Sequence, residues 1–167
     1  MEFVTDIVKV LVLAIVAGGL ATVIAGLLKK KPYADKMSFK ETLDLTDLPI
    51  LTFLVGDKKL NFVLDTGASS SYIHQGILGD IEHTDLGVEG TVYGMEGNRV
   101  ETGCATIVLK YKDTEFSDDF QVLDLSQPLA NLKETHGVNV HGFLGNSFFQ
   151  KYRYIIDFDE LVAYPSR

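Results

Sequence analysis

The sequence predicts an all-β, barrel-like domain with one short helix near its carboxyl end, preceded by a single transmembrane α-helix. From about residue 41 onward, short apolar or alternating runs are separated by polar and glycine-containing turns, a pattern typical of closely spaced strands. Residues 146–152 predict the short helix, with its cap at or near Asn146. An apolar run near the amino end predicts the membrane span.

The membrane span is predicted over residues 10–28, which form an uninterrupted run of apolar and small residues. A helix rising about 1.5 Å per residue over this length crosses most of a hydrocarbon layer of about 30 Å. The flank 1–9 carries Glu2 and Asp6, and the basic cluster Lys29–Lys31 follows the run. Because lysines stay on the cytoplasmic side, this order favours an anchor with a cytoplasmic domain. The alternatives are a cleaved secretory signal and a domain on an exported or periplasmic face.

The rest of the chain divides into a linker and one domain. Residues 29–40 are polar, contain Pro32 and lack helical periodicity, which indicates a juxtamembrane linker. Residues 41–167 are long enough for one globular domain, since the whole chain of 167 residues is 46% hydrophobic. The single Cys104 cannot form an internal disulfide, in agreement with a reducing compartment.

The charge distribution argues against a nucleic-acid partner. The chain has a formal charge of -8, and its pI is about 4.9, so phosphate groups are repelled. Residues 1–31 hold four lysines and two acids, so the acidic charge belongs to the predicted domain. The four histidines show no helical pair at i, i+4, and one cysteine is too few for structural zinc. We therefore expect neither a metal nor another cofactor.

The strands of the domain are expected in hairpins. The expected strands cover residues 50–55, 60–64, 105–111, 116–125, 154–158 and 161–164. The polar turns between the first two pairs are expected at Gly56–Lys59 and Lys112–Glu115. Residues 72–78 follow segment 64–71 and are expected to end a strand. Residues 129–133 are expected to form a helical turn.

Segment 64–71, Leu-Asp-Thr-Gly-Ala-Ser-Ser-Ser, places an acid where an apolar strand ends in a tight turn. Gly67 permits backbone angles that a side chain forbids, and the hydroxyls of Thr66 and Ser69 are able to bond the neighbouring main chain. Asp-Thr-Gly is also ordinary turn chemistry, so the flanking residues decide between a turn and a site. The apolar residues before Asp65 and the Ala-Ser after the glycine resemble the active-site signature of aspartic proteases.

A second motif lies about eighty residues downstream, where Val-His-Gly-Phe-Leu-Gly of residues 140–145 precedes Asn-Ser-Phe-Phe. The two motifs, in this order, resemble the active-site signature and the apolar-apolar-Gly element of retropepsin-like aspartic proteases. The resemblance covers residues 48–164. It implies that Asp65 is the catalytic acid/base. It also implies that Thr66, Gly67, Ala68 and Ser69 support the active site. The apolar-apolar-Gly element would then consist of Phe143, Leu144 and Gly145.

A hairpin with glycines at both ends of its tip is expected between residues 90 and 106. In a retropepsin-like fold, a hairpin at this chain position resembles the flap that closes over bound peptide. The expected flap residues are Tyr93, Gly94, Met95, Glu96 and Gly97. The alternative is a plain surface hairpin.

Only one Asp-Thr-Gly is present, so a two-lobed enzyme of this class is excluded: Asp113-Thr114 runs into Glu115, and Asp85 lacks the hydroxyl neighbour. The expected enzyme is therefore a membrane-anchored aspartic endopeptidase in which Asp65 meets its own copy across a homodimer. Two close carboxyls share one proton, so that one acts as base and the other as acid. Small residues recur every fourth position in the span, at Ala14, Gly18, Thr22 and Gly26. This spacing lets two membrane helices approach closely, and the alternative is that alanine and glycine are simply frequent in membrane helices.

The rival interpretation is a non-catalytic module of the same fold that is anchored to the membrane and binds a peptide or partner without cutting it. The intact Asp-Thr-Gly-Ala of residues 65–68 and the intact Gly145 favour the enzyme. Substrate, cleavage-site preference, pH optimum and self-processing leave no signal in the sequence. The long, partly polar segment 125–139 departs from short viral members of the family and leaves the dimer-interface strands unassigned.

Overall fold

The computed structural model describes residues 36–93 and 99–166. The predicted membrane span, the flank before it, most of the linker and the flap tip Gly94–Gly97 lie outside the described residues. Within the described ranges, no helix combines the length and the apolar character needed to cross a membrane.

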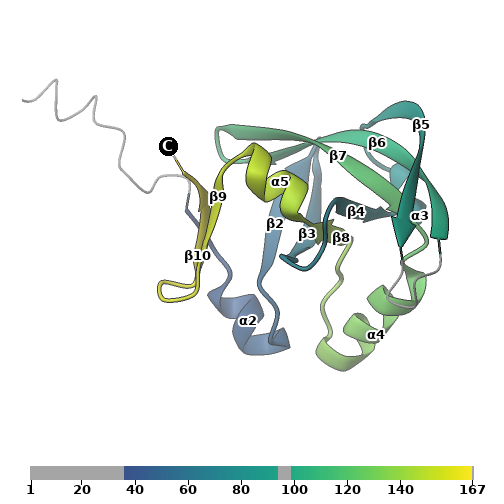
Figure 1. The fold of residues 1–167 in the computed structure, drawn as a ribbon. Coiled ribbons are helices and arrows are strands. Elements are labelled where there is room, and N and C mark those ends of the chain that lie inside the picture. The colour runs from purple at the N-terminus through teal and green to yellow at the C-terminus, as the bar shows by residue number, and fades with distance from the viewer. Residues whose placement is uncertain (1–35, 94–98, 167) are drawn as a thin grey trace, which may run out of the picture. The chain divides into compact units, whose positions relative to one another are not determined.

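The described part is predominantly β-structure (Figure 1). The strands are β1 (Met37–Ser38), β2 (Ile50–Val55), β3 (Lys58–Leu64), β4 (Ser71–His74), β5 (Thr84–Tyr93), β6 (Arg99–Tyr111), β7 (Thr114–Leu123), β8 (Gly142–Leu144), β9 (Tyr154–Asp157) and β10 (Val162–Pro165). The helices are α2 (Lys40–Thr46), α3 (Gln75–Leu78), α4 (Ser126–His136) and α5 (Asn146–Lys151). The predicted short helix near the carboxyl end is present as α5, but the described residues also contain α2, α3 and α4, so one helix was too few for the domain.

Seven strands form one sheet in the order β2-β3-β8-β4-β7-β6-β5. A further pairing between β2 and β6, at Leu54 and Lys110, joins the sheet back on itself and makes it barrel-like. Strand β8 lies between β3, to which it is parallel, and β4, to which it is antiparallel. A second sheet has the order β1-β10-β9.

The core consists mainly of side chains that point inward from alternating strand positions. In β2, Leu51, Phe53 and Val55 are buried while Thr52 is exposed, as a sheet with one buried face requires. Phe148 of α5 is fully buried and packs edge-on against Phe53 among other rings. This aromatic packing fixes α5 on the barrel, directly after the apolar-apolar-Gly element.

Several predicted boundaries differ from the observed ones. The β2–β3 turn is only Gly56-Asp57, with Gly56 at φ +59°, and the β6–β7 turn is only Lys112-Asp113. Met37 and Phe39, which were expected in the linker, are 3% and 0% exposed, so the folded part begins before residue 41. Strand β1 pairs with β10 there, and α2 follows.

Two helices were also predicted differently. The helical turn at 129–133 is the middle of the longer α4, and residues 72–78 divide into β4 and the short α3. Helix α5 begins after Gly145, which occupies the N-cap position without a side-chain hydrogen bond. The side chain of Asn146 is used elsewhere, as described below.

Candidate active site

The main chain places Asp65 immediately after β3. The preceding residues Val63 and Leu64 are about 5% exposed, and the N–H of Leu64 donates to the carbonyl of Pro49 (2.9 Å). The N–H of Asp65 itself donates to the carbonyl of Leu144 on β8 (2.9 Å). A buried strand thus ends in a partly exposed carboxylate whose backbone is held by the second sequence motif.

The turn after Asp65 is closed by the side chain and the carbonyl group of Asp65. The Oδ1 atom of Asp65 accepts the N–H of Gly67 (2.9 Å), and its carbonyl accepts the N–H of Ala68 (3.2 Å). The hydroxyls of Thr66 and Ser69 were expected to brace this turn, but within the described ranges neither makes a hydrogen bond. The backbone carbonyls of Thr66 and Ser69 accept the hydrogen bonds that hold the turn instead.

The residues after β8 hold those carbonyls. The Asn146 side chain donates from Nδ2 to the carbonyl of Thr66 (2.9 Å), and the backbone N–H of Asn146 donates to the carbonyl of Ala68 (2.9 Å). The N–H of Ser147 donates to the carbonyl of Ser69 (3.1 Å). The first turn of α5 thereby satisfies two of its free N–H groups and fixes the Asp65 turn at the same time.

Gly145 is required by close approach. A Cβ at this position would lie 2.2 Å from the carbonyl oxygen of Ser70 and 3.0 Å from that of Ala68. Its φ of -103° is ordinary, so lack of space is the reason for glycine, not backbone conformation. The structure thus brings together the predicted supporting residues 66–69 and the predicted element Phe143, Leu144 and Gly145.

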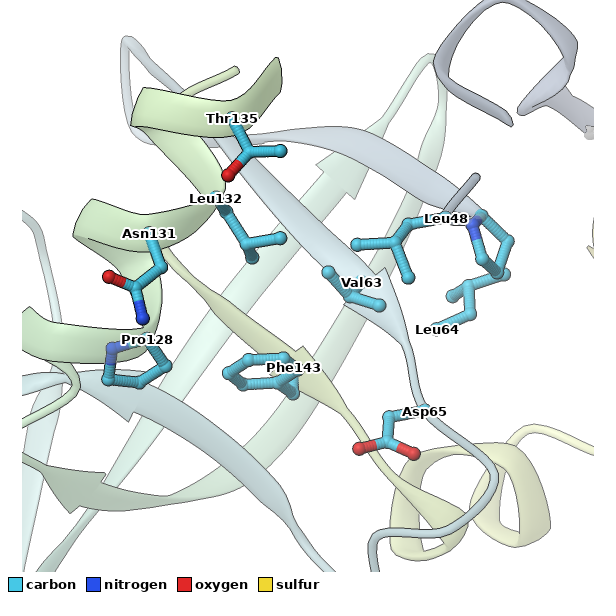
Figure 2. A pocket seen from close by; sticks show the side chains of 10 residues that line it. Leu48, Val63, Leu64, Asp65, Pro128, Asn131, Leu132, Thr135 and Phe143 are labelled. Carbon is cyan, nitrogen blue, oxygen red and sulfur yellow. The ribbon is translucent and has the colours of Figure 1, made fainter. Parts of the chain in front are cut away.

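A cleft of about 530 Å³ opens beside the Asp65 carboxylate (Figure 2). Val63, Leu64 and Phe143 line it from the sheet, and Leu48 and Pro49 from the segment before β2. The opposite wall comes from helix α4, as Figure 2 shows, through Pro128, Asn131, Leu132 and Thr135. The cleft is therefore mainly apolar, with a carboxylate at one end.

The wall residues on α4 were missed from the sequence. Their signal was only partial: Leu129 and Leu132, three positions apart, pack against the small cluster of Ile50, Val63 and Val140. That spacing indicates a helix face, but it does not reveal that the face borders Asp65.

The predicted flap corresponds to the hairpin of β5 and β6. These strands are antiparallel, and Tyr93 pairs with Arg99 at the last described position. The tip residues Gly94–Gly97 lie outside the described ranges, so their part in covering the cleft stays a prediction.

His141 clamps the strands behind the site. Its backbone N–H donates to Asn61 of β3 (2.8 Å), and its carbonyl accepts the N–H of His74 of β4 (3.1 Å). Its ring atom Nδ1 accepts the N–H of Asn61 (2.9 Å). Burial lowers the pKa of His141, so the ring is held neutral. In residues 36–93 and 99–166, no group of three His, Cys, Asp or Glu side chains gathers to hold a metal ion.

Comparison with known proteins gives one kind of match. No protein-family model matches the chain. No curated protein matches it either. Among solved structures, the chain is similar to the EIAV protease complexed with the inhibitor HBY-793, at 22% identity and a TM-score of 0.45. That match covers 62% of this chain and 86% of the viral protease chain. The functional argument therefore depends on the chain's own residues and geometry.

Proposed function

We propose that this protein is an aspartic endopeptidase that hydrolyses peptide bonds in extended polypeptide segments. The observation that carries the proposal is the placement of Asp65, whose carboxylate lies at the end of a mainly apolar cleft and whose backbone is bonded to Leu144. A carboxylate in such a place is accessible to a peptide, and its surroundings keep its direction fixed.

The proposed active unit is a homodimer, because each chain contributes one Asp-Thr-Gly. Two copies of Asp65 meeting at a twofold axis would share one proton. The ionised member would then take a proton from the attacking water, while the protonated member donates to the leaving nitrogen. Aspartic proteases are the established example of such a pair, which titrates as one unit.

The polypeptide would lie extended across the cleft, bound by main-chain hydrogen bonds as an added strand, with Tyr93–Gly97 as the covering flap. Residues 10–28 are proposed to anchor the enzyme in a bilayer with the domain on the cytoplasmic side. Anchoring two copies in one membrane raises their effective concentration and thus favours the dimer.

The test uses the full chain in lipid vesicles, incubated with a complex peptide library with and without a transition-state inhibitor of aspartic proteases. We expect inhibitor-sensitive cleavage that Asp65→Asn abolishes while dimerisation in sedimentation experiments persists. Asp85→Asn is the matched control, because Asp85 accepts the N–H of Gly87 (2.8 Å) just as Asp65 accepts that of Gly67. Cleavage unaffected by Asp65→Asn refutes the proposal, and library peptides retained uncut would support a binding module instead.

A further inference from the structure

An acid occupies a core position behind the Asp65 turn. In β7 the inward positions are Phe116, Asp118 and Phe120, which are 2%, 3% and 0% exposed. Burying a carboxyl among aromatic rings is costly unless its hydrogen bonds are satisfied. Asp118 therefore needs a reason beyond filling space.

The partner of Asp118 is Ser71, the first residue of β4, which is 0% exposed. The Ser71 hydroxyl donates to Oδ2 of Asp118 (2.6 Å) and accepts the N–H of Gly145 (3.3 Å). The N–H of Ser71 donates to the hydroxyl of Ser147 (3.2 Å). One buried hydroxyl thus links the acid to the residues that follow β8.

Those residues are the ones that hold the Asp65 turn. Gly145 lies against the carbonyl of Ser70, and Ser147 donates its own N–H to Ser69. The connection from the Asp118 carboxyl to the turn therefore runs through two hydrogen bonds and one close packing contact. No side chain of this brace lines the cleft.

Charges around Asp118 compensate its burial only in part. Burial raises the pKa of Asp118, and the Ser71 hydrogen bond, followed by the charge of Lys151, opposes that rise. Lys151 lies at the end of α5 and donates to the carbonyl of Ser117, as does the Tyr152 hydroxyl. The neighbouring Asp119 is exposed and accepts from Thr106 (2.6 Å). Strand β6 places the apolar Ile107 opposite Asp118.

We propose that Asp118 is a positioning residue for the Asp65 turn, acting through the hydrogen bond that it accepts from Ser71. The catalytic part of this inference rests on the proposed function, whereas the bracing of the turn does not. The pH dependence has a definite sign. Because burial disfavours the charged form, the contribution of Asp118 to folding is full below its ordinary pKa of about 3.8 and is lost as pH rises through the higher folded pKa.

Amide hydrogen exchange of the full chain tests the brace without relying on catalysis. Protection at Gly145 and Ser147 is compared in wild type, Asp118→Asn and Asp119→Asn from about pH 4 to about pH 8. Asparagine keeps the shape and the acceptor for Ser71 but cannot ionise. As pH rises, we expect these two amides to lose protection in wild type and Asp119→Asn but not in Asp118→Asn. The expected loss is about tenfold for each unit by which folding raises the pKa of Asp118. Equal pH dependence in all three overturns the inference.

Turnover separates positioning from a merely structural role. With active sites counted by a tight-binding inhibitor, Ser71→Ala is expected to lower kcat by about tenfold or more, with KM nearly unchanged. Asp118→Asn should keep kcat within about threefold at acidic pH, since it retains the hydrogen bond. A loss in Ser71→Ala that disappears once active sites are counted refutes positioning. If wild type cuts no peptide, the proposed function fails, and the exchange experiment still decides the brace.

Discussion

The backbone N–H of Asp65 donates a 2.9 Å hydrogen bond to the carbonyl of Leu144, and this bond joins the two sequence motifs. It extends the parallel pairing of β3 with β8, in which Leu64 lies beside Leu144. The backbone at Asp65 is therefore held by the main chain of β8, which itself lies between β3 and β4. Substitutions that disturb this packing should affect the site even when they touch no substrate.

Gly145→Ala should destabilise the domain, because its Cβ would lie 2.2 Å from the Ser70 carbonyl oxygen and that backbone cannot move freely. Overpacking of this kind costs about 1–3 kcal/mol or more. Gly79→Ala is the control, since a Cβ there meets nothing within 4 Å. Urea unfolding measures both variants. Equal unfolding free energies for the two would contradict the close-approach explanation.

His141 should make the domain less stable at mildly acidic pH. Burial lowers its folded pKa, so the unfolded chain takes up a proton first as pH falls below about 6.5. The free energy of unfolding is therefore highest above about pH 6.5 and decreases as pH falls, until the folded pKa of His141 is passed. The total decrease is about 1.4 kcal/mol for each unit by which folding lowers that pKa.

His141→Asn should remove this component, because the asparagine oxygen is able to accept the Asn61 N–H in place of Nδ1. Exposed His83 provides the matched substitution, His83→Asn. Chemical unfolding between about pH 5 and about pH 8 checks the prediction. A slope that persists in His141→Asn would assign it to other groups.

Leu132→Ala should change which side chain the cleft prefers. Leu132 lines the wall on α4, so shortening it enlarges the cleft across from Val63. We expect kcat/KM for a peptide with a large aromatic residue beside the cut bond to rise about tenfold relative to its leucine counterpart. Leu45→Ala on α2, where Leu45 is 62% exposed and outside the cleft, should leave the ratio unchanged. An unaltered ratio in Leu132→Ala would exclude α4 from the specificity site.

A chain that begins at Tyr33 should be a weaker protease at low concentration than the full chain in vesicles. The proposed anchor confines two copies to one membrane, which raises avidity by about 10²- to 10⁴-fold in linked systems. Specific activity measured across a dilution series, with sedimentation in parallel, checks this. Equal specific activity of both chains at high dilution would refute the anchoring role.

The strands were the most predictable part of the fold. Strand β2 was predicted with its observed bounds, because alternation of Leu51, Phe53 and Val55 with outward residues has a period of two. Helix α2 was missed, since its buried contributions are few and it lies beside a polar segment. Helix α4 was recognised only in part, because Pro128 sits in its first turn and its exposed face is polar.

The two motifs of the candidate site could be found from the sequence, and the structure places them in contact. The residues around them could not be found in this way. Asp118 and Ser71 are 47 positions apart, and only the register of β7 with β4 brings them together. One local sign was present, namely an acid at an inward position between Phe116 and Phe120. The α4 wall likewise depends on how a helix docks, which periodicity does not specify.

The insertion of β8 between β3 and β4 also bears on synthesis. As the chain leaves the ribosome, the Asp65 turn emerges about eighty residues before the strand that fixes it. Such a distant parallel pairing forms late, because a long loop must close first. A nascent polypeptide therefore carries the acid for about eighty residues of synthesis without the support that fixes its direction. The chain gains that support only after residues 142–147 have been made, so the candidate site is assembled late in synthesis.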